Sequence, residues 1–178
     1  GSEMCIRDRS YVYVQLSTAL VSSGFIDEAL KYINRSLEYN SENYFAPRLK
    51  AIFPFARDGN INRTRNLLIK EWNKDTSRLD ILQDVAKFYY IEENHDSAYF
   101  YFKKFVKARE DNGLNSYLEE NIKIAEVYKN MGLDAEAEKL FRDFSEYCEN
   151  DQSPYRSVNL VWKHAYEGKI EEAIEQLK

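Results

Sequence analysis

The pattern that decides the fold reads Gly24-Phe25-Ile26-Asp27-Glu28-Ala29-Leu30. It combines a glycine suited to a helix end, two acidic residues suited to a helix start, and a small residue inside that helix. The same pattern recurs as Gly132-Leu133-Asp134-Ala135-Glu136-Ala137-Glu138 and as Gly168-Lys169-Ile170-Glu171-Glu172-Ala173-Ile174. Recurrence of one turn-and-helix unit predicts a stack of similar helical units.

Two weaker copies of the pattern lie between these three. Thr64 stands in place of the alanine in one of them, and Glu93 stands in place of the glycine in the other. Successive separations are 35, 34, 39 and 36 residues along the series Ala29, Thr64, Ala98, Ala137 and Ala173. This spacing brackets the period of about 34 residues found in helix-turn-helix repeats.

The third and fourth copies carry a large-small-aromatic set before the turn. Val85-Ala86 and Tyr89 provide it in one copy, and Ile124-Ala125 and Tyr128 provide it in the next. In this respect the chain resembles the tetratricopeptide repeat (TPR) family. The resemblance implies an all-α, right-handed superhelical solenoid of antiparallel helix pairs, with about ten helices. We expect five repeats, the last one truncated, over residues 10–43, 44–77, 78–114, 115–152 and 153–178.

Composition supports the all-α class and excludes several kinds of partner. Only six glycines and three prolines interrupt a chain that is 31% charged and 44% hydrophobic. The net charge of −5, without a cluster of basic residues, argues against nucleic acid. No apolar run approaches the roughly 20 residues of a membrane span. Two cysteines, Cys5 and Cys148, are too few for a disulfide framework, so we expect a cytoplasmic protein.

The first residues differ from the rest of the chain. Gly1-Ser2 resembles the scar of tag cleavage, and residues 3–9 show no helical periodicity. We therefore expect residues 1–9 to be a non-native leader and residues 10–178 to form a single domain. We also expect the chain to be a piece of a longer, bacterial protein.

Local signals predict where several helices begin, bend and end. Glycines just past helix ends should adopt a left-handed conformation. Pro54 should kink the helix that spans it, because it removes one backbone hydrogen bond. A long helix is expected from about Asp96 to Asp111, and the sequence Ser116-Tyr117-Leu118-Glu119 predicts a capping box before the next helix.

In TPR proteins the first helices of successive pairs line a concave groove, and the resemblance places an equivalent groove here. The aromatic residues in it would anchor an extended or helical peptide, and Arg57, Lys87 and Lys129 would hold an acidic group of that peptide. The alternative is that each of these residues packs against a neighbouring helix or repeat. The predicted groove residues are Tyr11, Val14, Leu49, Phe53, Arg57, Gln83, Lys87, Tyr90, Ile122, Glu126, Lys129, Val158, Trp162 and Tyr166.

Catalytic candidates are few. His95 and His164 have no companion at metal-ligand spacing, and Cys148 has no nearby histidine to activate it. The sequence has no phosphate-binding glycine motif, so we expect no cofactor, no metal and no catalytic residue.

Two functions remain open. The first is a scaffold that binds a protein or peptide in the groove. The second is a regulatory or sensor segment of a larger bacterial signalling enzyme or transcription regulator. In either case the apolar residues Ile170, Ile174 and Leu177 lack a covering repeat. We expect this end either to dock onto a second copy, which would make a homodimer, or to pack against residues 1–9.

Overall fold

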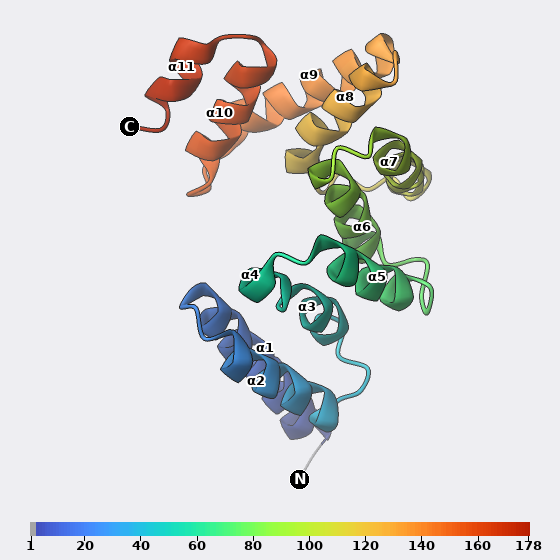
Figure 1. The fold of residues 1–178 in the computed structure, drawn as a ribbon, viewed down its shortest axis with the longest axis vertical. Coiled ribbons are helices and arrows are strands. Elements are labelled where there is room, and N and C mark those ends of the chain that lie inside the picture. The colour runs from blue at the N-terminus through green and yellow to red at the C-terminus, as the bar shows by residue number, and fades with distance from the viewer. Residues whose placement is uncertain (1–2) are drawn as a thin grey trace. The chain divides into compact units, whose positions relative to one another are not determined.

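The computed structural model describes residues 3–178, with side chains from Asp8 onward, and all regular elements in this range are helices (Figure 1). Gly1 and Ser2, where a tag scar was expected, lie outside the described residues. The first pair is α1 (Glu3–Ser22) and α2 (Ile26–Tyr39), and the second is α3 (Ala46–Ile52) continued by α4 (Phe55–Asp58), which pairs with α5 (Ile61–Trp72). The third pair is α6 (Leu79–Ile91) and α7 (His95–Asp111), and the fourth is α8 (Asn121–Asn130) and α9 (Asp134–Asn150), with the 3₁₀ turn η1 (Leu118–Glu120) before α8. The fifth pair is α10 (Arg156–Tyr166) and α11 (Ile170–Glu175).

The segment of α3 and α4 is one helix broken at Pro54. The Arg57 N–H donates to the carbonyl of Pro54, and the Ala56 N–H donates to that of Phe53. These hydrogen bonds join residues three positions apart, instead of the four positions of a regular α-helix. The predicted kink is confirmed. With α3 and α4 taken as one helix, the described residues form ten helices in five pairs, and the predicted all-α paired arrangement is also confirmed.

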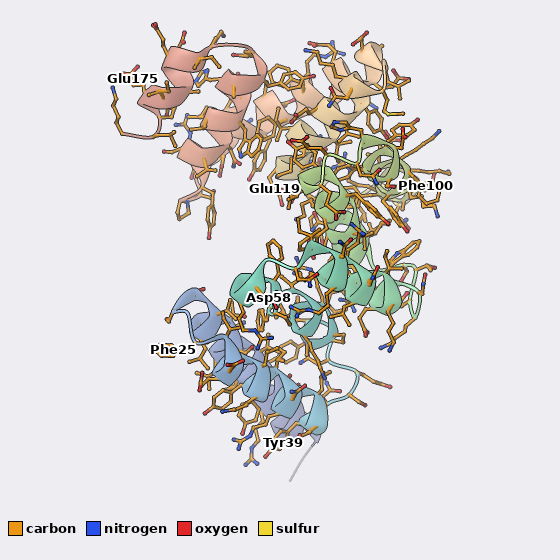
Figure 2. The ribbon with its side chains drawn as sticks, viewed as in Figure 1. Phe25, Tyr39, Asp58, Phe100, Glu119 and Glu175 are labelled. Atoms are coloured by element: carbon orange, nitrogen blue, oxygen red, sulfur yellow. The ribbon has the colours of Figure 1, made fainter. Side chains whose placement is uncertain are left out.

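The five turns inside the pairs share one geometry. The residue before each N-cap has a positive φ, of 85°, 62°, 57°, 74° and 75° at Gly24, Gly59, Glu93, Gly132 and Gly168. Two labelled residues in Figure 2 mark the first two turns: Phe25 follows Gly24 in the chain, and Asp58 precedes Gly59. Four residues into each second helix, a backbone N–H bonds to the N-cap carbonyl at 2.9–3.1 Å, from Ala29, Thr64, Ala98, Ala137 and Ala173.

These five small residues are almost completely buried, with exposures of 0, 0, 0, 1 and 6% in chain order. A small side chain at this position lets the two helices of a pair approach closely. The period read from the sequence therefore corresponds to one repeated structural position.

Contacts divide the chain into two compact units, which meet between Val85 and Ala86. In unit 1 the side chains of Val14, Ala29, Ile33, Ala46 and Phe53 form a buried cluster. In unit 2 a corresponding cluster contains Ile122, Phe144 and Cys148, with Phe141 and Tyr166 packed against it. Each unit thus has its own apolar core.

A buried polar network ties the first three helices of unit 1 together. The Ser10 hydroxyl donates to the Ser36 carbonyl at 3.0 Å, and the Asn43 amide donates to the Ser10 hydroxyl at 2.8 Å. The Asn43 side-chain oxygen accepts from the backbone N–H groups of Phe45 and Ala46, at the start of α3. This asparagine therefore caps one helix and anchors another.

Helix α1 begins at Glu3, so residues 3–9 are helical although their sequence shows no helical periodicity. One expectation about a helix start is wrong. Ser116 does not cap the fourth pair, because Tyr117 has a φ of 59° and packs its ring edge-on against Phe105 of α7. The long helix expected up to Asp111 is confirmed as α7. Within residues 3–178, none of the helices has the length and apolar character required to cross a bilayer.

Candidate functional site: the cleft between α6, α8 and α10

In unit 2, α8 and α10 lie in contact, and together with the end of α6 they surround a cavity of about 470 Å³. We name it the α8–α10 cleft. Six of its eight lining residues belong to the groove expected from the sequence. The lining consists of Tyr90, Ile122, Glu126, Lys129, Asn130, Trp162, Ala165 and Tyr166.

The floor of the cleft is part of the core of unit 2. Ile122 is 2% exposed and belongs to the buried cluster, and the ring of Tyr166 stacks on Phe141 with the centroids 4.5 Å apart. Burial raises the pKa of Tyr166, so its hydroxyl stays protonated. The apolar wall of the cleft is therefore continuous with the packed core of unit 2.

One strong polar contact crosses the cleft from α6 to α8. The Tyr90 hydroxyl donates to Oε2 of Glu126 at 2.5 Å. Burial and this bond to a carboxylate both raise the pKa of Tyr90, so the phenol remains a neutral donor. The contact fixes the position of the Glu126 carboxylate and leaves its other oxygen without a hydrogen-bond donor in residues 8–178.

A second cavity, of about 320 Å³, adjoins the cleft at the turn after α6, and we name it the turn cavity. It shares Tyr90, Glu126 and Asn130 with the cleft, and its remaining lining residues are Ile91, Glu93 and His95. Glu93 is the residue with a left-handed backbone in the position that glycine occupies in the other four turns.

Two lysines on α8 lie over aromatic rings of α10. Nζ of Lys129 is 5.2 Å from the centroid of the Tyr166 ring, and Nζ of Lys123 is 5.6 Å from that of Trp162. Cations at this distance from an aromatic face are attracted to it. The α10 side of the cleft is thus basic and aromatic, while the α6 side carries Glu126.

Lys87, predicted as a ligand-binding cation, has an internal partner instead. Its Nζ lies 2.9 Å from Oε1 of Glu120, and Nζ of Lys123 lies 2.9 Å from Oε2 of the same carboxylate. Burial alone would raise the pKa of Glu120, but the two lysines outweigh it and hold the pKa below its usual value. The role expected for Lys87 is corrected, because its charge is needed by a carboxylate that is only 6% exposed.

In unit 1 the predicted groove residues do not form a comparable surface. Val14 and Phe53 are each 4% exposed, so the expectation that they face outward is wrong; they fill the space between α1, α2 and the kinked helix. Leu49 packs against the same cluster, and Gln83 is 5% exposed.

The remaining predicted groove residues, Tyr11, Arg57 and Val158, lie in different surroundings. The ring of half-buried Tyr11 meets Phe45 edge-on, with the centroids 6.1 Å apart. Arg57 is paired with Asp27 at 2.9 Å, so this second predicted cation also has an internal carboxylate partner. Val158 is 50% exposed and is not part of the cleft lining.

The sequence interpretation missed five lining residues of the two cavities, which are Ile91, Glu93, His95, Asn130 and Ala165. Asn130 follows Glu126 by four positions and Ala165 follows Trp162 by three, so helical periodicity could have placed both on the lining face. Ile91 is the last residue of α6 and follows Tyr90, a predicted groove residue. Glu93 lies in the turn and His95 is the first residue of α7, where the periodicity of the first helices gives no information.

Neither a model of a protein family nor a curated protein matches the sequence. Solved structures do. TTC0263, a thermophilic TPR protein of Thermus thermophilus, superposes with a TM-score of 0.63 and 18% identity, over 94% of this chain and 87% of that chain. The fold is TPR-like. Pseudomonas aeruginosa pilF superposes with a TM-score of 0.63 and 18% identity, over 98% of this chain and 74% of that chain. YrrB is described as a TPR protein with an unusual peptide-binding site. It superposes with a TM-score of 0.54 and 19% identity, over 93% of this chain and 81% of that chain.

Cys148 of this TPR-like chain is placed for packing. Cys148 is completely buried, and burial raises the pKa of its thiol to about 11, so it is a poor nucleophile near neutral pH. Nδ1 of His164 lies 3.8 Å from Glu167 on the next turn of chain. Within residues 8–178, no three His, Cys, Asp or Glu side chains are grouped so that they could hold a metal ion.

Proposed function

We propose that this TPR-like chain is a protein-interaction scaffold and that its α8–α10 cleft binds a peptide segment of a partner protein. The observation that carries the proposal is the meeting of Tyr90, Trp162 and Tyr166 around one cavity of about 470 Å³. Rigid aromatic rings bury a large apolar area at a low cost in conformational entropy, and they dominate the energy of many interfaces.

The polar groups of the cleft are suited to orienting a bound chain. Glu126 and Asn130 on α8 offer acceptors, and Asn130 and Lys129 offer donors, along one edge of the aromatic wall. A cavity of this size, apolar with a few converging polar groups, is typical of ligand sites. The peptide-binding site described for YrrB, on a related fold, gives the proposal further support.

Binding without catalysis, in a cytoplasmic setting, is part of the same proposal. The thiol of Cys148 is buried, and the Glu126 carboxylate is engaged by a neutral phenol rather than by a second acid or a base. These groups suit recognition better than proton transfer.

The test begins with selection of a random peptide library displayed on phage, using the whole chain as bait. Affinities of the selected synthetic peptides are then measured by fluorescence anisotropy for wild type, Trp162→Ala and Tyr155→Ala. Tyr155 is the matched control, because it is a 71% exposed aromatic outside the cleft. We expect Trp162→Ala to weaken binding by about tenfold or more and Tyr155→Ala to have little effect. Equal binding by wild type and a folded Trp162→Ala would refute the cleft as the site.

A further inference from the structure

Two carboxylates at the α6 side of the cleft form no ion pair within residues 8–178. They belong to Glu126 and Glu93, which both line the turn cavity. The only side chain in the same range that bonds to Glu126 is the neutral Tyr90 hydroxyl. His95 also lines this cavity but forms no ion pair with either carboxylate in the part of the chain that the structure describes, so both carboxylates are left without a paired cation.

The cations of the surrounding surface are engaged elsewhere. Lys87 and Lys123 share Glu120, which needs both because it is nearly completely buried. The ammonium of Lys129 lies over the Tyr166 ring, on the α10 side. These contacts leave the acidic side of the cleft open to a cation brought by a ligand.

Glu93 places a carboxylate at the turn cavity, in a position that carries no side chain in the other four turns. Glycine occupies this position in those turns, with nothing within 4 Å of where a Cβ would lie. The third turn therefore differs from the others by adding a charged group to the lining of the cavity.

From these observations we infer that the peptide bound by the cleft carries a lysine or arginine side chain, which enters the turn cavity and pairs with Glu126 and Glu93. The inference rests on the proposed function, since it specifies which peptide the cleft accepts. It also reverses the expectation that the groove selects an acidic group. The aliphatic part of the long basic side chain packs along Tyr90 and Ile91, while its cation reaches the two carboxylates.

The net charge of the chain acts in the same direction. At −5 it attracts basic segments over a distance of about one Debye length, roughly 8 Å at physiological salt. Pairing across a partly desolvated cavity then contributes to the lifetime and the specificity of the complex.

The experiment uses the selected peptides described above. Each peptide is synthesised in two forms, with its lysine or arginine present or replaced by norleucine, which keeps the aliphatic chain and removes the charge. On the wild-type protein we expect the norleucine form to bind about tenfold more weakly. On Glu126→Gln, which keeps an oxygen able to accept from Tyr90, we expect the two forms to bind within about twofold of each other.

Glu138→Gln is the control, because it removes an exposed carboxylate of α9 outside both cavities. It should leave the tenfold difference between the two peptide forms unchanged, and Glu93→Gln should reduce that difference.

Outcomes separate this inference from the proposed function. Selected peptides without a basic residue, or a ratio that Glu126→Gln leaves unchanged, would overturn the inference while the cleft remained a binding site. Peptides that bind wild type and folded Trp162→Ala equally would overturn the proposed function, and the inference with it.

Discussion

The ammonium of Lys87, on α6, lies 2.9 Å from the carboxylate of Glu120, at the start of α8. Glu120 is 6% exposed and also accepts from Lys123, so the three charges form one compact group. A lysine that the repeat register assigned to ligand binding thus connects two helices of unit 2.

Removal of the Lys87 charge should destabilise the fold. In Lys87→Met the Glu120 carboxylate keeps only Lys123, and we expect a loss of about 2 kcal/mol, below the full cost of an isolated buried charge. Urea unfolding followed by circular dichroism measures it. Lys129→Met, which removes a cation that lies over a ring, should change stability by about 0.5 kcal/mol or less. Equal effects of the two substitutions would mean that the Glu120 contact contributes no stability.

The same carboxylate should make stability depend on pH. Its folded-state pKa lies below the ordinary value of 4.5, so the unfolded chain takes up a proton first as pH falls. The stabilising contribution is complete above pH 4.5 and is lost as pH falls through the lower folded-state pKa. Unfolding free energies measured from about pH 6 to about pH 3 should therefore fall less steeply in Glu120→Gln than in wild type. Glu138→Gln, on an exposed face, is the control.

Glu93→Gly should raise stability. Glycine removes the strain of a φ of 57°, and we expect a gain of about 1 kcal/mol after the added freedom of the unfolded chain is subtracted. Gly132→Ala imposes the opposite change at an equivalent turn and should cost about 1 kcal/mol. Thermal unfolding measures the change in stability of each variant. A loss of stability in Glu93→Gly would show that the Glu93 side chain stabilises the fold by more than its left-handed backbone destabilises it.

Asn43→Ala should strongly destabilise unit 1. The substitution removes the acceptor at the start of α3 and the donor to Ser10, both in a site that is 2% exposed. We expect a loss of about 2–3 kcal/mol. Asn40, whose side chain accepts from an exposed turn, is the matched control, and Asn40→Ala should cost about 0.5 kcal/mol. The measurement is urea unfolding of the two variants side by side.

Phe53 and Trp162 occupied equivalent places in the predicted groove, but they should respond differently to truncation. Phe53→Ala leaves a cavity in the core of unit 1 and should cost about 3–5 kcal/mol. Trp162 is 37% exposed, and Trp162→Ala should cost about 1 kcal/mol while it weakens peptide binding. Urea unfolding of both variants measures the difference. Similar losses of stability in both would contradict the different burial of the two side chains.

Much of the fold could be predicted because its signals are local. The turn glycines, the small residue four positions into each second helix, and the break at Pro54 depend on residues within one turn of chain. Tyr117 is an exception, because a contact distant in the sequence decides its backbone conformation. Its neighbours in sequence fit a capping box, but its ring packs on Phe105, twelve positions earlier, and that contact holds the backbone in another conformation.

The candidate site could be predicted only in part. Helical periodicity placed Ile122, Glu126 and Lys129 on one face of α8, and all three line the cleft. Periodicity could not show that Lys87 would be paired with Glu120, because these residues are 33 positions apart and meet only when α6 and α8 pack. Nor could it separate Phe53 from Trp162, whose burial depends on the break at Pro54 and on the neighbours of each unit.

The sequence by itself determined the repeat period, the five turns and the all-α class, because backbone conformation and helix approach depend on small sets of nearby residues. The tertiary structure decided which charges are neutralised inside the protein and which remain open at the cleft. The physical reason is that an ion pair or a buried ring depends on what lies across from it, and that partner comes from a segment distant in the chain.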